Sequence, residues 1–311
     1  MLFSNRWTDF AVLYAGGGEK YERWGDVFLQ RPDPQAIWEK NLPDIRVENP
    51  AGEEKTWPAP HAVYHRSETG GGFWEKKKNF PRRWQISYPA ICGTLRFWIE
   101  PTGFKHTGLF PEQAVNWDFC AARISERVKQ NGEVRVLNLF AYTGAATMAC
   151  AAAGASEVVH VDASRGMIGK AKENAEISGL QNRLIRFIAE DCNRFVDREI
   201  RRGRRYQGII MDPPAYGRGP QGELWKLEDS LYPFVEKCGR LLSDDALFFL
   251  VNAYTTGLSP LSLESVLRLG VRSRLGGSVS ADELALPISE MDAFLPCGIV
   301  GRWIPEQGGV W

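Results

Sequence analysis

Short apolar runs alternate with helical patterns over the last two-thirds of the chain. The clearest run, residues 134–139, consists mainly of valine and leucine, which is the composition of a strand buried in a parallel sheet. An alanine-rich stretch follows at 145–153 and predicts a helix that ends at Gly154. This strand–helix unit predicts the beginning of a parallel sheet covered by helices.

The pattern repeats toward the C-terminus. Further strands are predicted at residues 158–162, 184–189, 208–212 and 246–253. Helical spacing of apolar residues predicts helices at 114–131, 165–178, 193–202, 222–242 and 259–269. The last strands are predicted at 272–275 and 298–302. The alternation of strands and helices predicts a doubly wound α/β domain that spans residues 101–311.

Residues 1–100 have a different pattern, with many Trp, Gly and Pro residues and short alternating runs. These runs predict strands at 11–14, 26–30, 61–65, 84–88 and 95–99. Glycine triplets predict turns at 16–18 and 70–72, and a proline-rich turn leads into a short predicted helix at 36–40. We therefore expect a smaller β-rich N-terminal domain that ends near residue 100.

Composition excludes several classes of protein. The 311 residues are 44% hydrophobic and 24% charged, with a formal net charge of 0, so any contact with nucleic acid must come from local basic patches. The six cysteines form no CxxC pair and the four histidines are far apart, which argues against a metal site and a disulfide framework. There is no signal-peptide pattern, and the alanine-rich stretch is too short to span a membrane. We expect a cytoplasmic protein with reduced thiols.

Polar residues stand where the predicted parallel strands end. Asp162 ends the second strand, 18 residues after Gly144, and a carboxylate at that position can accept both hydroxyls of a ribose. Asp191 follows the third strand, and the fourth leads into Asp-Pro-Pro-Ala-Tyr-Gly at 212–217. Because ligands of open α/β sheets bind outside the carboxyl ends of the strands, these residues predict one binding site.

These motifs together resemble the class I S-adenosylmethionine-dependent methyltransferases. They are most similar to the bacterial large-subunit ribosomal RNA methyltransferases of the cytosine-C5 type and their relatives. The resemblance covers roughly residues 10–303 and rests on the segments 103–113, 138–144 and 212–214 with Asp162 and Asp191. It implies a Rossmann-like, seven-stranded sheet, S-adenosylmethionine as cofactor and a structured RNA as substrate.

The resemblance also implies roles for individual residues. Asp162 would hold the ribose, Asp191 the adenine side, and the 138–144 loop the methionine end; Asp191 could instead only cap a helix, and 105–113 could be only a linker. The implied cofactor-binding residues are Lys105, Gln113, Asn138, Phe140, Tyr142, Thr143, Gly144, Asp162, Ala163, Ser164, Asp191 and Asp212. Either Lys105 or His106 would lie near the methionine carboxylate.

The 212–217 turn is the predicted catalytic element. Its prolines fix the backbone and remove two N–H donors, which leaves carbonyls to accept hydrogen bonds from a base, while an aromatic ring can stack on a base extruded from its helix. The alternative is a rigid turn after a buried strand. The implied catalytic residues are Asp212, Pro213, Pro214 and Tyr216.

The sequence also bears on which atom is methylated. Cytosine-C5 relatives carry a nucleophilic cysteine after the fifth strand, but residues 252–257 contain none and Thr255 is the best match. We therefore predict methylation of a nitrogen, with guanine N7 as the leading candidate. The alternatives are cytosine-C5 chemistry through Cys192 or Cys238, and a module that binds cofactor or RNA without catalysis. A dehydrogenase would require G-x-G-x-x-G, of which only Gly144 is present.

Residues 75–83 form the densest basic stretch, and Phe80 and Trp84 interleave with its charges. Basic groups can hold phosphates and aromatic rings can stack on unpaired bases; equally, the stretch can be a solvated hairpin whose aromatics fold onto the core. We expect the strand-end loops to share one cleft that faces this hairpin. A second basic run at 198–205 is typical of a helix C-terminus.

Overall fold

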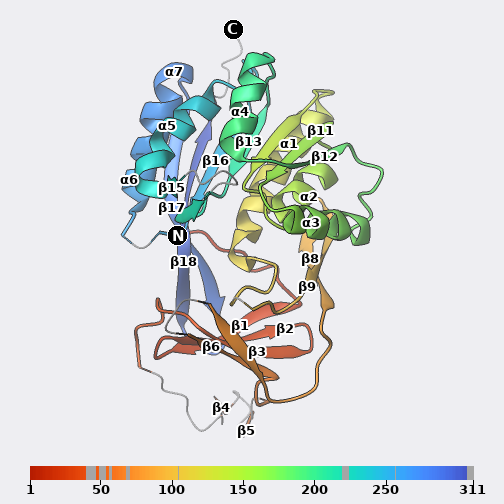
Figure 1. Ribbon diagram of the computed structural model, residues 1–311, viewed down its shortest axis with the longest axis vertical. Coiled ribbons are helices and arrows are strands. Elements are labelled where there is room, and N and C mark those ends of the chain that lie inside the picture. Colours follow the sequence, from red (N-terminus) through yellow and green to blue (C-terminus); the bar gives the residue numbers. More distant parts are fainter. Residues whose placement is uncertain are drawn as a thin grey trace.

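The computed structural model describes residues 1–39, 47–48, 54–55, 58–67, 71–103, 105–218, 224–255 and 257–306. An upper α/β part and a lower β-rich part lie one above the other (Figure 1). The predicted turn at 70–72 and helix at 36–40 fall partly outside the described residues, and residues 36–39 form no helix.

The upper part is built on parallel strands. These are β10 (Arg135–Leu139), β11 (Glu157–Asp162), β12 (Ile185–Ala189), β13 (Gly208–Met211) and β16 (Phe248–Ala253). Two antiparallel strands, β18 (Ala293–Ile304) and β17 (Ser278–Ile288), complete the order β12-β11-β10-β13-β16-β18-β17. The predicted seven-stranded, doubly wound arrangement is confirmed. The chain reverses its direction of travel across the sheet between β10 and β13, which is where such folds bind ligands.

Alternation along the strands builds a core on each face of this sheet. Val136 and Val158 belong to one buried cluster, whereas Leu137 and Val159, their chain neighbours, belong to the other, because successive side chains of a strand point to opposite faces. Since both faces are covered, the strands are apolar nearly throughout, which explains why they could be recognised in the sequence.

Helices cover both faces of the sheet (Figure 1). The first cluster includes residues of α1 (Ala114–Lys129), α2 (Ala145–Ala152) and α3 (Arg165–Ile177). The second includes residues of α4 (Cys192–Arg201), α5 (Leu227–Gly239) and α6 (Pro260–Leu267). A π-helical turn, η2 (Arg268–Arg272), and α7 (Ser273–Leu275) continue α6.

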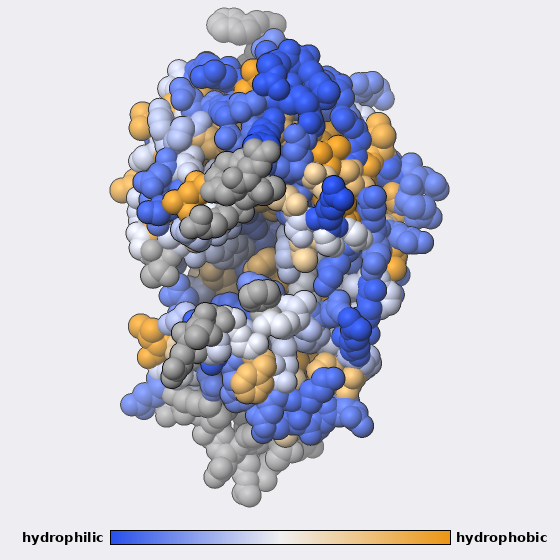
Figure 2. All heavy atoms as spheres, viewed as in Figure 1, coloured by the Kyte–Doolittle hydropathy of each residue, from blue (hydrophilic) through white to orange (hydrophobic). Residues whose placement is uncertain are grey.

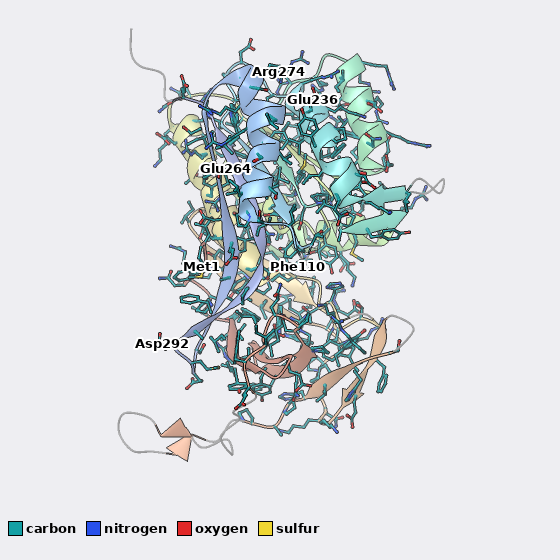
Figure 3. The ribbon with its side chains drawn as sticks, turned by 90° about the vertical axis from the view of Figure 1, so that its left-hand side faces the viewer. Met1, Phe110, Glu236, Glu264, Arg274 and Asp292 are labelled. Atoms are coloured by element: carbon teal, nitrogen blue, oxygen red, sulfur yellow. The ribbon has the colours of Figure 1, made fainter. Side chains whose placement is uncertain are left out.

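The lower part extends the same sheet. Its strands are β1 (Phe10–Gly16), β2 (Glu19–Trp24), β3 (Val27–Pro32), β6 (Ala62–Arg66) and β7 (Gly72–Lys76). β1 pairs with the end of β17 through Val12 and Ile288, so the twelve strands are continuous. Figure 3 shows Asp292, in the turn between β17 and β18, beside the N-terminal strands, and Arg274 at the opposite end of the molecule. The long β17–β18 hairpin therefore joins the two parts.

Among the described residues, three smaller hairpins lie outside this sheet. They are β4 (Val47–Glu48) with β5 (Glu54–Lys55), β8 (Trp84–Ala90) with β9 (Gly93–Ile99), and β14 (Tyr216–Arg218) with β15 (Leu224–Lys226). The β8–β9 hairpin packs against the upper part, where the Trp98 N–H donates to Asn174 Oδ1 at 2.8 Å. The hairpin precedes residue 100 in the sequence but contacts the helices that follow that residue. A domain boundary near residue 100 therefore stays a prediction.

Two further element predictions were wrong. The stretch 222–242, predicted as one helix, contains strand β15 before α5 in its described residues, because pairing with β14 overrides the helical spacing. Residues 272–275, predicted as a strand, are helical, and β17 follows them instead. In β17 the alternation was hard to recognise because the strand carries Asp282 and Glu283 and is only partly buried over its first half.

Within the described residues, none of the helices has the length and apolar character needed to cross a membrane. The same part of the chain contains no cluster of three or more His, Cys, Asp or Glu side chains arranged to hold a metal ion.

Candidate active site

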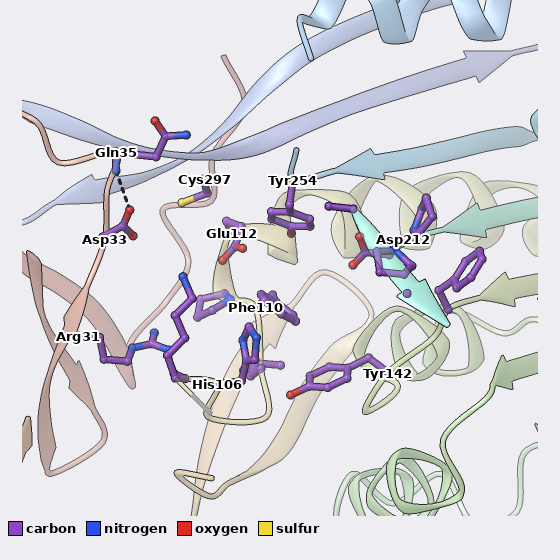
Figure 4. A pocket seen from close by; sticks show the side chains of 18 of the residues that line it. Arg31, Asp33, Gln35, His106, Phe110, Glu112, Tyr142, Asp212, Tyr254 and Cys297 are labelled. Atoms are coloured by element: carbon purple, nitrogen blue, oxygen red, sulfur yellow. Dashed lines mark hydrogen bonds between the residues drawn. The ribbon is translucent and has the colours of Figure 1, made fainter. Parts of the chain in front are cut away.

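The loops after the parallel strands surround a cavity of about 760 Å³. Figure 2 shows the surface hollowed between the upper and lower parts, and Figure 4 shows the cavity from close by. Most of the predicted site residues line it: Lys105, Phe140, Tyr142, Asp162, Ala163, Ser164, Asp191, Asp212, Pro213 and Pro214. Gln113, Asn138, Thr143 and Gly144 line a smaller pocket of about 50 Å³ that shares Phe140, Tyr142 and Asp212 with the first.

The loop between β10 and α2 has an unusual backbone. Phe140 and Tyr142 have φ of 54° and 49°, and Gly144 has φ of 88°; a positive φ is costly for residues other than glycine and persists only where the surroundings impose it. Hydrogen bonds hold this shape: Thr143 Oγ1 donates to the Gly108 carbonyl at 2.7 Å, and the Tyr142 N–H donates to Asp162 Oδ2 at 2.9 Å. The loop is thus preformed at the N-terminus of α2.

Asp162 lies at the end of β11, where its carboxylate faces the cavity. Besides the Tyr142 N–H, it accepts the Ser164 N–H through Oδ1 at 2.8 Å. Burial raises the pKa of Asp162 above its ordinary value, and these two backbone donors act in the opposite direction. Each oxygen keeps a further lone pair, so the carboxylate can still accept two hydroxyl groups.

Asp191 caps helix α4, since its Oδ1 accepts the Arg194 N–H at 3.0 Å. The capping alternative is therefore correct, and it is compatible with a ligand contact because Asp191 also lines the cavity. Ser164 caps α3 in the same way, accepting the Met167 N–H at 3.4 Å.

Asp212 follows β13 and lies inside the cavity wall. Burial raises the pKa of Asp212 to about 7, with a smaller contribution from the nearby Glu112 carboxyl. The carbonyls of Pro214 and Ala215 accept hydrogen bonds from Trp225 Nε1 and the Leu227 N–H, at 2.7 and 3.0 Å. These bonds fix the turn that holds Asp212 against the cavity.

Tyr216 is the one predicted site residue that the structure leaves outside both pockets. It belongs to β14, is 57% exposed and pairs with Lys226 across the β14–β15 hairpin. Trp225, on the partner strand, lines the cavity instead and packs at 5.3 Å from the Phe140 ring. A stacking role for Tyr216 stays a prediction, and Trp225 is the aromatic residue that this hairpin presents to the site.

The 105–113 segment lies along the cavity and does not merely connect the two parts. Its Phe110 ring stands 5.4 Å from Tyr142 and 5.7 Å from Tyr254. Gln113 donates to the Tyr254 hydroxyl and accepts from Asn116 Nδ2 at 2.8 Å. These contacts form an aromatic wall, to which Tyr254 contributes from the loop after β16.

A solved S-adenosylmethionine-dependent methyltransferase from Agrobacterium tumefaciens is 35% identical to this chain. The similarity covers 98% of this chain and 93% of that one, with a TM-score of 0.87. The chain belongs to the S-adenosylmethionine-dependent methyltransferases. The family match extends over residues 83–227, which include the 105–113 segment and the strand ends that carry Asp162, Asp191 and Asp212.

Two further comparisons show what this chain is similar to. The ribosomal RNA large subunit methyltransferase K/L of Shewanella sp. (strain MR-4) is 29% identical over 195 residues, which are 61% of this chain and 25% of that protein. The chain thus spans about a quarter of the length of that relative. A putative methyltransferase solved with SAH shares the fold at 17% identity, with a TM-score of 0.68 over 96% of this chain and 76% of that one.

S-adenosylmethionine is the cofactor of this family, and the residues around the cavity suit it. The cofactor carries a ribose with two hydroxyls, and Asp162 offers two carboxylate oxygens with lone pairs to spare. It also ends in a carboxylate, and the N-terminus of α2 at Gly144 presents backbone N–H groups of the kind that bind anions.

The lower part of the methyltransferase contributes cavity residues that the sequence analysis missed. Arg31 makes two hydrogen bonds of 2.7 Å to the Glu22 carboxylate, and Lys20 lies 3.1 Å from Asp33. All four line the cavity. They come from β2, β3 and the residue after β3, far in sequence from the cofactor motifs, so no local signal marked them.

The structure places Cys192 and Cys238, the two cysteines considered as alternative nucleophiles, outside the cavity lining. Cys192 lies beneath the β10–α2 loop, where its Sγ accepts the Phe140 N–H at 3.3 Å, and Cys238 is fully buried in the core. Neither lines the cavity, whereas Cys297 of β18 does. Burial, together with the neighbouring Glu112, raises the pKa of Cys297 well above its ordinary value.

The aromatic residues of the basic stretch face the N-terminal core. The Phe80 ring packs 5.9 Å from Trp84 and 6.2 Å from His61, and Trp84 Nε1 donates to the Trp24 carbonyl at 2.8 Å. Neither residue lines the cavity. The structure fits the alternative in which these rings fold back onto the core, and residues 77–83 connect two different sheets.

Proposed function

We propose that this methyltransferase transfers a methyl group to a nitrogen of a base in structured RNA, with guanine N7 as the leading candidate. The observation that carries the proposal is that Asp212 and Asp162 face one cavity whose wall is aromatic, a suitable surface for a flat base. The similarity to a ribosomal RNA methyltransferase supports RNA as the substrate class.

In this proposal the predicted residues that line the two pockets have the roles implied by the family resemblance. Asp162 holds the ribose and Asp191 lies on the adenine side, while the 138–144 loop holds the methionine end with Lys105 and Gln113 close by. The Asp212–Pro214 turn places the acceptor base. S-adenosylmethionine supplies an electrophilic methyl group on a positively charged sulfur.

The protein contributes orientation and electrostatics to the transfer. The acceptor nitrogen forms the new bond with its lone pair as the bond from carbon to sulfur breaks, and the electrons of that bond remain on sulfur. Positive charge therefore moves onto the base, and a guanine methylated at N7 is a cation. An ionised Asp212 beside the base stabilises that charge, and the enclosing aromatic residues exclude water.

A nitrogen acceptor is favoured over carbon 5 of cytosine because the cavity offers no ready thiolate. Methylation of that carbon requires a thiolate that adds to the neighbouring carbon. Cys297 is the only cysteine among the described cavity residues, and burial beside Glu112 keeps it as a thiol. A nitrogen already has the lone pair that the reaction needs.

We expect Cys297→Ala to retain methyl transfer within about threefold of the unsubstituted protein, because no covalent step passes through this thiol. The measurement is transfer of a radiolabelled methyl group to total RNA, followed by nucleoside mass spectrometry. The expected product is 7-methylguanosine. If 5-methylcytosine is formed instead, and the substitution abolishes it, the cytosine-C5 alternative is correct and Cys297 is its nucleophile.

The same experiment tests the proposed function itself. A module that binds the cofactor without catalysis would bind S-adenosylhomocysteine in calorimetry yet transfer no label to RNA. Label on RNA at a guanine nitrogen supports the proposal, whereas a lack of transfer to RNA that has not already been modified contradicts it.

A further inference from the structure

Glu112 is a buried carboxyl group in the wall of the active-site cavity. It is 7% exposed and lies in the short 3-10 helix η1 (Pro111–Gln113) directly before α1. In Figure 4, Glu112 and Asp212 lie on either side of Tyr254 and Phe110. The aromatic wall is therefore flanked by two carboxyl groups, of which only Asp212 belongs to the family's catalytic turn.

The nearby cations are already paired with other acids. Arg31 and Lys20 make ion pairs with Glu22 at 2.7 and 3.5 Å, and Lys20 makes another with Asp33. No ion pair joins Glu112 to any residue in the described ranges. A buried carboxylate without a charged partner is unfavourable unless donors satisfy it. The donors to Glu112 are the Tyr254 hydroxyl and a backbone N–H, and a carboxylate with about four lone-pair sites can accept further hydrogen bonds from a ligand.

The position of Glu112 is fixed by its neighbours in the chain. Trp7 Nε1 donates to the Pro111 carbonyl at 3.0 Å. On the other side, Gln113 is hydrogen-bonded to Tyr254 and Asn116. A carboxyl group held in this way is suited to recognition, because little conformational freedom remains to be lost on binding.

Several charged and titratable groups act on Glu112. Burial raises the pKa of Glu112, whereas Lys20, Arg31 and a hydrogen bond from Tyr254 lower it; Asp212 and Cys297 also lie within electrostatic range of it. A ligand that presents N–H donors would favour the ionised carboxylate still further.

Among the four RNA bases, guanine presents the donors that match a carboxylate. Its N1–H and 2-amino group lie side by side, so two parallel hydrogen bonds can reach the two carboxylate oxygens. Adenine and cytosine present an amino group next to an acceptor nitrogen, and uracil presents one N–H between two carbonyls. Guanine N7 lies on the opposite edge of the base from these donors.

We propose that Glu112 selects guanine by accepting hydrogen bonds from N1–H and the 2-amino group of the acceptor base. With that edge on Glu112 and the ring along Phe110 and Tyr254, N7 points toward the Asp212 side of the cavity. The inference rests on the proposed function and extends it, since it names the residue that determines which base is methylated.

The test compares guanosine with inosine, which keeps N7 and N1–H but lacks the 2-amino group. The methylated nucleotide is first mapped on a ribosomal RNA transcript, and synthetic RNA is then made with guanosine or inosine at that position. We expect the unsubstituted protein to prefer guanosine by roughly 10- to 100-fold in kcat/KM, from the loss of one charge-assisted hydrogen bond.

In Glu112→Gln the same preference should fall below about threefold, while the affinity for S-adenosylhomocysteine in calorimetry remains unchanged. Glu126→Gln, an exposed position on the following helix α1, is the matched control and should behave as the unsubstituted protein. Equal rates on guanosine and inosine overturn the role of Glu112, as does an undiminished preference in Glu112→Gln or a loss of its cofactor affinity. No methylation of RNA, or methylation of another base, overturns the proposed function and this inference together.

Discussion

Asp212→Asn is expected to lower kcat for methyl transfer by roughly 10²- to 10³-fold, while the affinity for S-adenosylhomocysteine changes little. The expected size is that of removing one preorganised electrostatic group aimed at developing charge. Asp212 is suited to this task because it lies partly buried in the cavity wall after β13, where a charge interacts more strongly with its surroundings than in open water. Single-turnover kinetics with the mapped RNA measure the effect.

The pH dependence provides a second measurement for Asp212. Its pKa is raised to about 7, and the ionised form is the active one, so kcat/KM should rise with pH below about 7 and level off above it. The rise of kcat/KM with pH should be absent in Asp212→Asn. Asp244→Asn, an exposed position, is the matched control. If Asp212→Asn retains full activity with the same profile, Asp212 is only a structural residue of the turn.

The cavity residues at the ends of the parallel strands were the part of the site most accessible from sequence. Strands buried on both faces are apolar to their ends, so the first polar residue after each one is conspicuous. Asp162, the last residue of β11, was found in this way. Asp191 follows Glu190 after the partly exposed edge strand β12, so its assignment also needed the resemblance to the family; both residues line the cavity. The strand-end residues could be predicted to lie together because the carboxyl ends of parallel strands lie at the same edge of a sheet, whatever the details of packing.

The cavity residues outside the strand-end motifs could not be found in this way. Lys20 and Arg31 belong to strands β2 and β3, and Cys297 belongs to β18; all three line the cavity, and the pairing of β1 with β17 links these strands in one sheet. That pairing joins opposite ends of the chain, and no periodic pattern encodes which strand another will meet. Glu112 lies in the 103–113 segment on which the resemblance rests, but its burial and its lack of an ion pair among the described residues are tertiary properties.

The 212–226 region shows how a local pattern can identify the element and miss the side chain. The Asp-Pro-Pro turn was predicted as the catalytic element, and Asp212, Pro213 and Pro214 line the cavity. The aromatic residue was assigned to Tyr216, whereas the β14–β15 pairing presents Trp225. Side chains alternate along a strand, so the β14–β15 hairpin determines which aromatic ring faces the site. This hairpin was not predicted, because the spacing of apolar residues in 222–242 indicated a helix.

Asp162→Ala is expected to weaken the binding of S-adenosylmethionine and S-adenosylhomocysteine by at least tenfold and up to about 100-fold. The pair of charge-assisted hydrogen bonds to the ribose would be lost, and we expect the loss of this pair to cost roughly 1.5–3 kcal/mol in total. The substitution also removes the acceptor of the Tyr142 and Ser164 N–H groups. The β10–α2 loop, with Tyr142 at a positive φ of 49°, should therefore lose part of its support.

Calorimetry with S-adenosylhomocysteine measures the affinity, and thermal unfolding without cofactor shows whether the variant is folded. Asp162→Asn separates the two contributions, because its remaining carbonyl oxygen can hold one backbone N–H while the negative charge is gone. We expect its affinity to lie between that of the unsubstituted protein and that of Asp162→Ala. Asp229→Ala, at an exposed position of α5, should bind normally. A folded Asp162→Ala protein whose dissociation constant stays within twofold would show that the ribose is held elsewhere.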